Sequence, residues 1–124
     1  MGKIPNYFPT VTPYLIIDNA VSFIEFTQRV FNADLLNKHM RDEKIIMHAE
    51  IKIGNSIIMI ADSTAEYKPM NMGLFIYVED ADITYNLAIQ MGASVVTELS
   101  NQSYGRSGGV KDAFGNTWWI TSVI

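Results

Sequence analysis

The pattern of apolar and polar positions along the chain occurs twice. "YLIIDNA" from Tyr14 and "FIYVEDA" from Phe75 each place a short apolar run before an acidic residue, a second polar residue and an alanine. "IGNSIIMI" from Ile53 and "FGNTWWIT" from Phe114 each place Gly-Asn and a hydroxyl residue before another apolar run. Both pairs lie 61 residues apart in a chain of 124, and landmarks that keep one offset indicate a tandem repeat.

Each copy predicts one helix among extended segments. In the first copy Ala20, Phe23, Ile24 and Phe31 recur at helical spacing, and in the second Ile83, Leu87 and Met91 do so. Asn19 and Asp80 precede these helices as N-cap residues, because their side chains can accept from free backbone N–H groups. Strands are expected at the two apolar runs before the helices and at six further segments: 35–40, 44–53, 56–61, 95–99, 107–111 and 117–122.

The order of these elements predicts an α+β fold. Each half reads βαβββ, and Gly54-Asn55 and Gly115-Asn116 lie where tight hairpin turns belong. Two tandem βαβββ modules would form a curved mixed sheet around a concave cavity, with one helix over each module. We expect a single domain, 1–124, with modules at about 10–62 and 72–124 and a linker at about 63–71.

Composition narrows the class of protein. There is no cysteine, which excludes disulfides, thiolate metal sites and a cysteine nucleophile. The net charge is −4 and no basic stripe appears, so a nucleic-acid partner is not expected. The chain shows neither a membrane-length apolar run nor a signal-peptide stretch at "MGKIPNYF", so we expect a cytoplasmic protein with no membrane contact.

Three stretches carry a resemblance to a known family. They are "TPYLIIDNAVSFIEF" from Thr12, "MHAEIKIGNSIIMIAD" from Met47 and "YGRSGGVKDAFGNTWWI" from Tyr104. With the doubled βαβββ unit they resemble the vicinal oxygen chelate superfamily, which includes glyoxalase I, bleomycin-resistance proteins and extradiol dioxygenases, and within it the PhnB-like branch. The most specific part is the D-x-F-G-x-x-W pattern at 112–118, in which Ala113 stands where the branch usually has proline.

The resemblance implies four metal-ligand positions, one on each of four strands. Carried over by position, they fall on Thr12, Gly73, Ile58 (or its neighbour Met59) and Trp119. None of these is a normal ligand of a divalent cation, which takes carboxylate oxygens or imidazole nitrogens. We therefore expect no metal and no cofactor, and neither glyoxalase I nor ring-cleaving dioxygenase activity.

The strand "KIIMHAEIKI" offers two candidates for catalysis or ligand binding. Residues 45, 47, 49, 51 and 53 form an apolar face suited to packing on a helix, which turns His48 and Glu50 toward the cavity. Histidine titrates near neutral pH, and a carboxylate beside it can orient or charge it. The alternative is a solvated histidine beside a surface carboxylate that pairs with Lys52.

Aromatic residues extend the expected cavity wall. Four aromatic residues are expected on the same side of their strands as the carried-over metal positions: Tyr14, Phe75, Tyr77 and Trp119. Trp118 lies on the opposite side and should pack under a helix. Such walls suit a flat or partly apolar ligand, although aromatic residues are also common in cores. Met59 joins this expected lining, since a two-residue turn at Gly54-Asn55 would place it opposite Glu50. "QSYGRSGG" from Gln102 is read as a mobile loop in which Arg106 either clamps an anionic ligand or is an ordinary loop charge.

Three functions remain compatible with the residues. The first is a small-molecule binding protein of the glyoxalase and bleomycin-resistance type, without the usual metal catalysis. The second is an atypical or metal-independent lyase or isomerase that uses His48 and Glu50. The third is an interaction module whose cleft is filled by its own aromatic side chains. Cavities of the superfamily often form between two chains, so a homodimer is expected.

Overall fold

The computed structural model describes residues 2–124 and shows two successive βαβββ modules. The first module contains β1 (Tyr14–Ile17), α1 (Ala20–Phe31), β2 (Asp34–Met40), β3 (Ile46–Ile53) and β4 (Ser56–Asp62). The second contains β5 (Gly73–Tyr77), α2 (Ala81–Gln90), β6 (Ser94–Gln102), β7 (Gly105–Lys111) and β8 (Thr117–Ser122). The predicted α+β fold of tandem βαβββ modules is confirmed.

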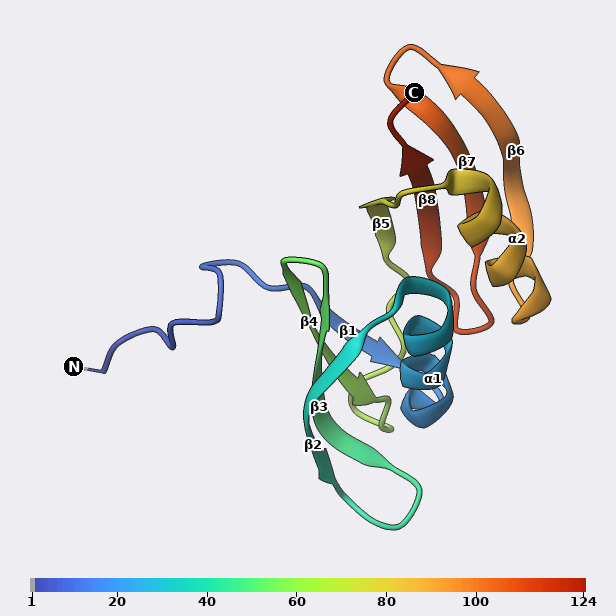
Figure 1. The fold of residues 1–124 in the computed structure, drawn as a ribbon. Helices are drawn as coiled ribbons and strands as arrows, with labels where there is room; N and C mark the ends of the chain where they lie inside the picture. The colour runs from blue at the N-terminus through green and yellow to red at the C-terminus, as the bar shows by residue number, and fades with distance from the viewer. Residues whose placement is uncertain (1) are drawn as a thin grey trace.

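Each module has its own four-stranded sheet. The strand orders are β1-β4-β3-β2 and β5-β8-β7-β6, so the two sheets repeat one topology. Both sheets are mixed, because β1 runs parallel to β4 and β5 parallel to β8 while the other pairs are antiparallel. In Figure 1 the two modules lie side by side with α1 and α2 near each other, and the sheets extend away from the junction. The expected curved sheet is therefore two separate sheets within one chain.

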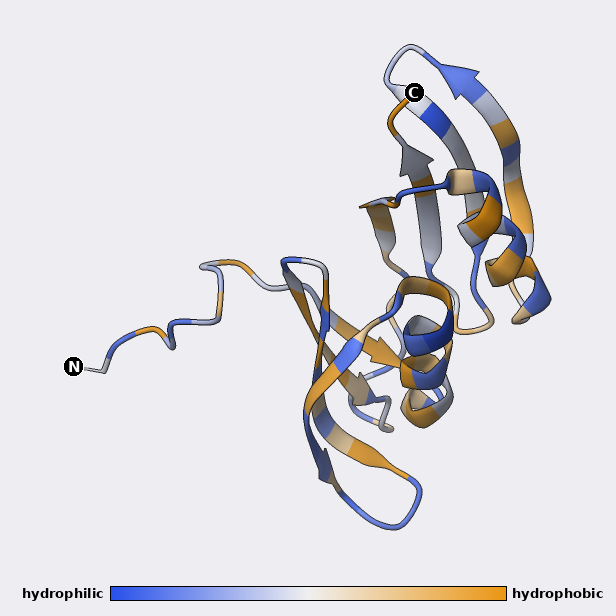
Figure 2. Ribbon diagram, viewed as in Figure 1, coloured by the Kyte–Doolittle hydropathy of each residue, from blue (hydrophilic) through white to orange (hydrophobic). Residues whose placement is uncertain are grey.

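Each helix covers one face of its own sheet. The face of the first sheet toward α1 carries Leu15, Ile51 and Ile60, which are fully buried. In Figure 2 both helices alternate between hydrophobic and hydrophilic stretches, as expected of helices with one buried side. None of the helices within residues 2–124 is long and apolar enough to cross a membrane.

The junction between the modules is aromatic. Phe114, from the β7–β8 loop, lies edge-on to Phe23 of α1 at 5.5 Å between ring centroids. The ring of Phe31, at the end of α1, lies 4.5 Å from that of Trp118 on β8. Both contacts join residues of different modules, and all four belong to or pack against one continuous core. The most specific sequence pattern, at 112–118, thus contributes two of the aromatic residues that hold the modules together.

The two Gly-Asn pairs lie in equivalent hairpins but in different turns. In the first hairpin Ile53 pairs with Ser56, so Gly54 and Asn55 form a two-residue turn, and Gly54 has the positive φ of 57° that favours glycine. In the second hairpin Lys111 pairs with Thr117, which leaves a loop over residues 112–116. The prediction of a tight turn at Gly115-Asn116 was therefore wrong in length.

This longer loop changes the repeat offset along the last strands. Tyr14 pairs with Met59 in the first module and Phe75 pairs with Trp119 in the second. The first strands thus match at an offset of 61, whereas the last strands match at 60. The first residues of the two helices show the same two offsets. The N–H of Ala20 donates to Asp62 and the N–H of Ala81 donates to Ser122, so the donors lie 61 residues apart and the acceptors 60.

Two local expectations differ from the structure. The segment from Gln102 to Gly109 belongs mostly to the β6–β7 hairpin rather than to a mobile loop, because β7 begins at Gly105. Near the start of β3, Ile46 is fully buried and Met47 is 49% exposed, the reverse of the expected alternation. The β2–β3 pairing has an irregularity between His39 and Met40, and such a bulge changes which side chains face the helix.

Candidate ligand-binding site

The face of each sheet turned away from its helix, here called the open face, carries the candidate residues. On the first sheet the pairs Tyr14–Met59, Glu50–Met59 and Asn37–Glu50 place one residue from each strand on this face. His48 lies two residues before Glu50 on β3 and therefore on the same face, where it pairs with His39 of β2. Sequence reasoning did not identify Asn37, since only the β2–β3 register brings it beside the candidates.

A hydrogen-bonded row of polar side chains crosses this face. Glu50 is only 6% exposed, and one of its carboxylate oxygens accepts from Asn37 Nδ2 at 2.6 Å. The other oxygen, Oε2, lies 3.0 Å from Nε2 of His48, whose side chain is 26% exposed. The ring of Tyr14 lies 5.8 Å from the imidazole of His48. Burial makes these pairings stronger than solvated ones and holds the imidazole in a fixed orientation.

The open face of the second sheet is aromatic. Phe75 and Tyr77 stand edge to face with ring centroids 5.0 Å apart, and Tyr104 lies 6.4 Å from Phe75. Trp119 pairs with Phe75 across the β5–β8 register. We call these four residues the aromatic cluster. They are 37–63% exposed. Tyr104, from the β6–β7 turn, is the member that sequence reasoning missed.

Trp119 lies flat against its own sheet. The residue of β7 that pairs with Trp119 is Gly109, and a Cβ at position 109 would lie 2.5 Å from the indole ring. A side chain at residue 109 would therefore displace the indole from the sheet surface. The glycine allows Trp119 to lie against the backbone with its outer ring face available to a ligand.

Arg106 lies apart from the other candidates. It pairs with Ser122, on the face of the second sheet that α2 covers. Its Nε donates to Asp82 Oδ1 at 2.7 Å and its Nη2 to Asp82 Oδ2 at 3.1 Å. The guanidinium holds the pKa of Asp82 below its usual range, mainly through this hydrogen bonding. The hypothesis that Arg106 clamps an anionic ligand gains no support, because its N–H groups donate to Asp82 in the first turn of α2.

The Arg106–Asp82 pair predicts a pH-dependent stability difference. Replacing Arg106 by Gln should lower stability at neutral pH, because the pKa of Asp82 is depressed only in the folded protein. This contribution is present above the unfolded-state pKa of about 3.9 and is lost as pH falls through the lower folded-state pKa. Urea midpoints of both proteins should therefore converge in acid. Lys111→Gln, at an exposed position of the same strand, is the control, and an equal, pH-independent loss in both variants would contradict the prediction.

The residues at the carried-over metal positions do not fit a divalent cation. Of the two alternatives on β4, Met59 lies on the open face, whereas Ile58 is buried against the core. With Thr12, Gly73 and Trp119 this set supplies no carboxylate and no imidazole. Within residues 2–124 no three His, Asp or Glu side chains gather around a point that could hold a metal ion.

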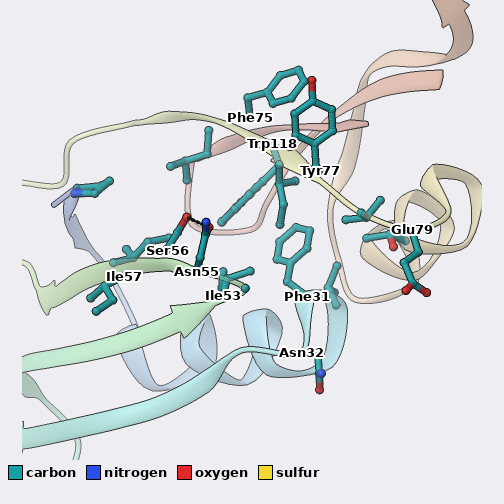
Figure 3. Close-up of a pocket in the computed structure, with 18 of the residues that line it drawn as sticks. Phe31, Asn32, Ile53, Asn55, Ser56, Ile57, Phe75, Tyr77, Glu79 and Trp118 are labelled. Carbon is teal, nitrogen blue, oxygen red and sulfur yellow. Dashed lines mark hydrogen bonds between the residues drawn. The ribbon is translucent and has the colours of Figure 1, made fainter. Parts of the chain in front are cut away.

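A large hollow lies at the module junction. It has a volume of about 1140 Å³ and runs between the β3–β4 hairpin, the end of α1 and β5. Figure 3 shows Phe31 and Trp118 at its centre and Phe75 and Tyr77 above them. His48, Glu50 and Trp119 do not line it. The hollow is nevertheless continuous with the aromatic cluster, because Phe75 and Tyr77 belong to both.

The structure thus divides the sequence candidates between two faces. Tyr14, His48, Glu50 and Met59 share the open face of the first sheet. Phe75, Tyr77 and Trp119 share that of the second. In a single chain the two open faces belong to sheets that extend away from the junction, as Figure 1 shows. The first face offers hydrogen bonding, and the second offers aromatic surface.

Comparison with known proteins gives both sequence and structural relatives. The family model of the Glyoxalase/Bleomycin resistance protein/Dioxygenase superfamily matches residues 10–120. The chain is 30% identical over 131 residues to the uncharacterized protein Mb0911c of Mycobacterium bovis, and the match covers 96% of this chain and 86% of that protein.

Solved structures share the fold at low sequence identity. The PhnB protein from Bacillus cereus superposes with a TM-score of 0.75 at 17% identity, covering 93% of this chain and 100% of that one. TnmS3, an antibiotic binding protein from Streptomyces sp. CB03234, superposes with a TM-score of 0.70 at 15% identity, covering 94% and 100%. At these identities the similarity extends to the fold alone.

Proposed function

Since the chain belongs to the glyoxalase/bleomycin resistance protein/dioxygenase superfamily, we propose that it is a small-molecule binding protein for flat aromatic ligands. The observation that carries this proposal is the aromatic cluster, in which four contacting or paired aromatic side chains remain 37–63% exposed. Exposed apolar groups gathered on one face commonly mark a binding surface. Stacked and edge-to-face geometries suit a planar ring.

The binding proposed here uses no divalent metal. The residues at the family's ligand positions include a glycine, a tryptophan and a methionine, none of which binds a hard or borderline cation. TnmS3, a structural neighbour, is described as an antibiotic binding protein, which supports small-molecule binding as a role for this fold. Similarity to the PhnB protein and the D-x-F-G-x-x-W pattern support the PhnB-like branch.

The test uses the two tryptophans as reporters in one spectrum. The chain has two tryptophans, so a ¹⁵N-labelled sample gives two indole N–H signals. Titration with 2-naphthol should shift the signal of Trp119, which belongs to the cluster. The signal of Trp118 should stay in place, because that indole is 2% exposed and donates to Asp112. Trp119→Phe assigns the signals without disturbing the buried ring.

Matched tyrosine variants locate the site. Tyr77→Ala should weaken 2-naphthol binding about fivefold or more, the effect of one aromatic contact. Tyr67→Ala removes a tyrosine of similar exposure, 60% against 63%, outside the cluster and should leave affinity unchanged. Prior treatment with EDTA, or addition of Ni²⁺ or Zn²⁺, should not alter the titration. Equal effects of the two tyrosine variants, or loss of binding on chelation, would refute the proposal.

We further propose that the protein is a homodimer. A second copy would allow the polar open face of one chain to meet the aromatic open face of the other, an arrangement that one chain does not make. It would also cover aromatic surface that is exposed in the single chain. Sedimentation equilibrium at micromolar concentration should give about twice the chain mass of 13.9 kDa. A single species at the chain mass would refute the homodimer.

A second candidate function rests on the His48–Glu50 pair. Their 3.0 Å contact, with Glu50 nearly buried, is the geometry of a histidine oriented for proton transfer. A metal-independent lyase or isomerase would use His48 as the base. Chemical conversion of a bound ligand that disappears in His48→Gln, with binding retained, would favour this function over binding alone.

A further inference from the structure

The hydrogen-bonding pattern of Glu50 determines which nitrogen of His48 carries a proton. Each carboxylate oxygen has one partner, Asn37 Nδ2 at 2.6 Å and His48 Nε2 at 3.0 Å. An ionised carboxylate only accepts hydrogen bonds, so the imidazole nitrogen facing it has to donate. In the neutral ring this places the hydrogen on Nε2 and leaves Nδ1 as an acceptor.

The same cluster contains a second acceptor without a donor. Asn37 gives its amide N–H to Glu50, while its Oδ1 is buried and has no hydrogen-bond partner within residues 2–124. The His48 side chain is 26% exposed and its Nε2 faces Glu50, so Nδ1 is the ring nitrogen left to accept from a ligand. Buried polar atoms are normally paired, and an unpaired acceptor destabilises the site until a donor reaches it.

We infer that the open face of the first sheet selects ligands that present a hydrogen-bond donor on an aromatic ring, with a phenolic hydroxyl as the simplest form. The hydroxyl donates to Nδ1 of His48, and the ligand ring lies against Tyr14, whose own ring is 5.8 Å from the imidazole. Glu50 and Asn37 act as positioning residues that fix the tautomer. This inference rests on the proposed function and on the proposed homodimer, in which the polar open face of one chain meets the aromatic open face of the other, so that a ligand bound at His48 also reaches Trp119 of the second copy.

The neighbouring charges agree with a neutral donor. Glu50 is an anion at the centre of the cluster, which disfavours a carboxylate or phosphate at the same place. Lys52 and His39 also belong to this side of the sheet by register, but both side chains are exposed. A hydroxyl or N–H group satisfies the acceptors without bringing a second negative charge to Glu50.

The test compares 2-naphthol with 2-methoxynaphthalene, which keeps the ring and lacks the donor. Wild-type protein should bind 2-naphthol at least about fivefold more tightly, the usual contribution of one hydrogen bond. A two-bond ¹H–¹⁵N spectrum of the free protein should show His48 protonated at Nε2, with His39→Gln used to assign the two imidazoles.

Glu50→Gln tests the positioning role without removing the imidazole. An amide N–H facing Nε2 would turn that nitrogen into an acceptor and move the hydrogen to Nδ1, so the preference for 2-naphthol should disappear. His48→Phe should also abolish the preference while retaining a ring beside Tyr14.

The outcomes separate the inference from the proposed function. If both compounds shift the Trp119 indole signal with equal affinity, or if free His48 is protonated at Nδ1, the inference is overturned and aromatic binding stands. If neither compound shifts that signal, the proposed function fails for naphthalene-type rings, and the inference fails with it. If 2-naphthol binds more tightly and Glu50→Gln keeps the preference, Glu50 has no positioning role.

Discussion

Asp112→Ala should be the most damaging polar substitution in the chain. Asp112 is 4% exposed, and its Oδ1 accepts from the backbone N–H groups of Phe114 and Asn116 at 2.9 Å each. Its Oδ2 accepts from Nε1 of Trp118 at 2.8 Å. Removing the carboxylate leaves four donors without partners, three of them on the buried residues Asn116 and Trp118. We expect the free energy of unfolding to fall by about 3–4 kcal/mol, measured by urea denaturation.

Asp42→Ala provides the matched control for this substitution. Asp42 also accepts from two backbone N–H groups, those of Lys44 and Ile45 at 2.8 Å, and these bonds lower its pKa. It is exposed in the β2–β3 turn, so water replaces the lost acceptor and the effect should be far smaller. If the two alanine variants lose similar stability, burial of the Asp112 network is not what matters.

Phe31→Ala should lower both the stability of the protein and the coupling between its modules. Phe31 is 8% exposed and packs on Trp118 of the other module at 4.5 Å and on Phe26 at 6.0 Å. Truncating a buried phenylalanine removes apolar burial and leaves a cavity, which typically lowers stability by about 3–5 kcal/mol. Because the lost contact joins the modules, we also expect the unfolding transition to broaden as the two modules begin to unfold separately.

Phe75→Ala separates module coupling from loss of aromatic surface. Phe75 is 51% exposed on the open face, so its truncation should change stability little while weakening 2-naphthol binding. Calorimetry of both variants distinguishes the two effects. A sharp, unshifted transition in Phe31→Ala would mean that the modules are held together by contacts other than the Phe31–Trp118 pair.

The order of the elements could be predicted from the sequence because it depends on short-range patterns. Apolar residues at helical spacing from Ala20 to Phe31 and alternating apolar residues in the strands act over a few residues. The cap positions Asn19 and Asp80 likewise depend on neighbours, and their side chains accept from Ser22 and Ile83, respectively. Because the sequence landmarks keep one offset, the elements expected in one module could also be expected in the other. Together they predicted the α+β fold of tandem βαβββ modules.

The tertiary structure alone decided which residues share a face. The sequence offset of 61 matched Ile58 to Trp119, yet the structure matches Met59 to Trp119, because the β7–β8 loop is longer than the β3–β4 turn. Side chains alternate along a strand, so a shift of one residue moves a position from the open face to the core. The length of the loop between two strands is not encoded in the apolar periodicity of the strands themselves.

The partners of the candidate residues were also decided by tertiary structure. Local sequence patterns identified His48 and Glu50 as candidates. The β2–β3 register then places Asn37 within hydrogen-bonding distance of Glu50. The packing of α2 on its sheet likewise places Asp82 beside Arg106. These contacts join residues 13 and 24 positions apart in the chain. The sequence determined the chemical groups that the protein carries, and the pairing of its strands determined which of them act together, because hydrogen bonds depend on distance in space.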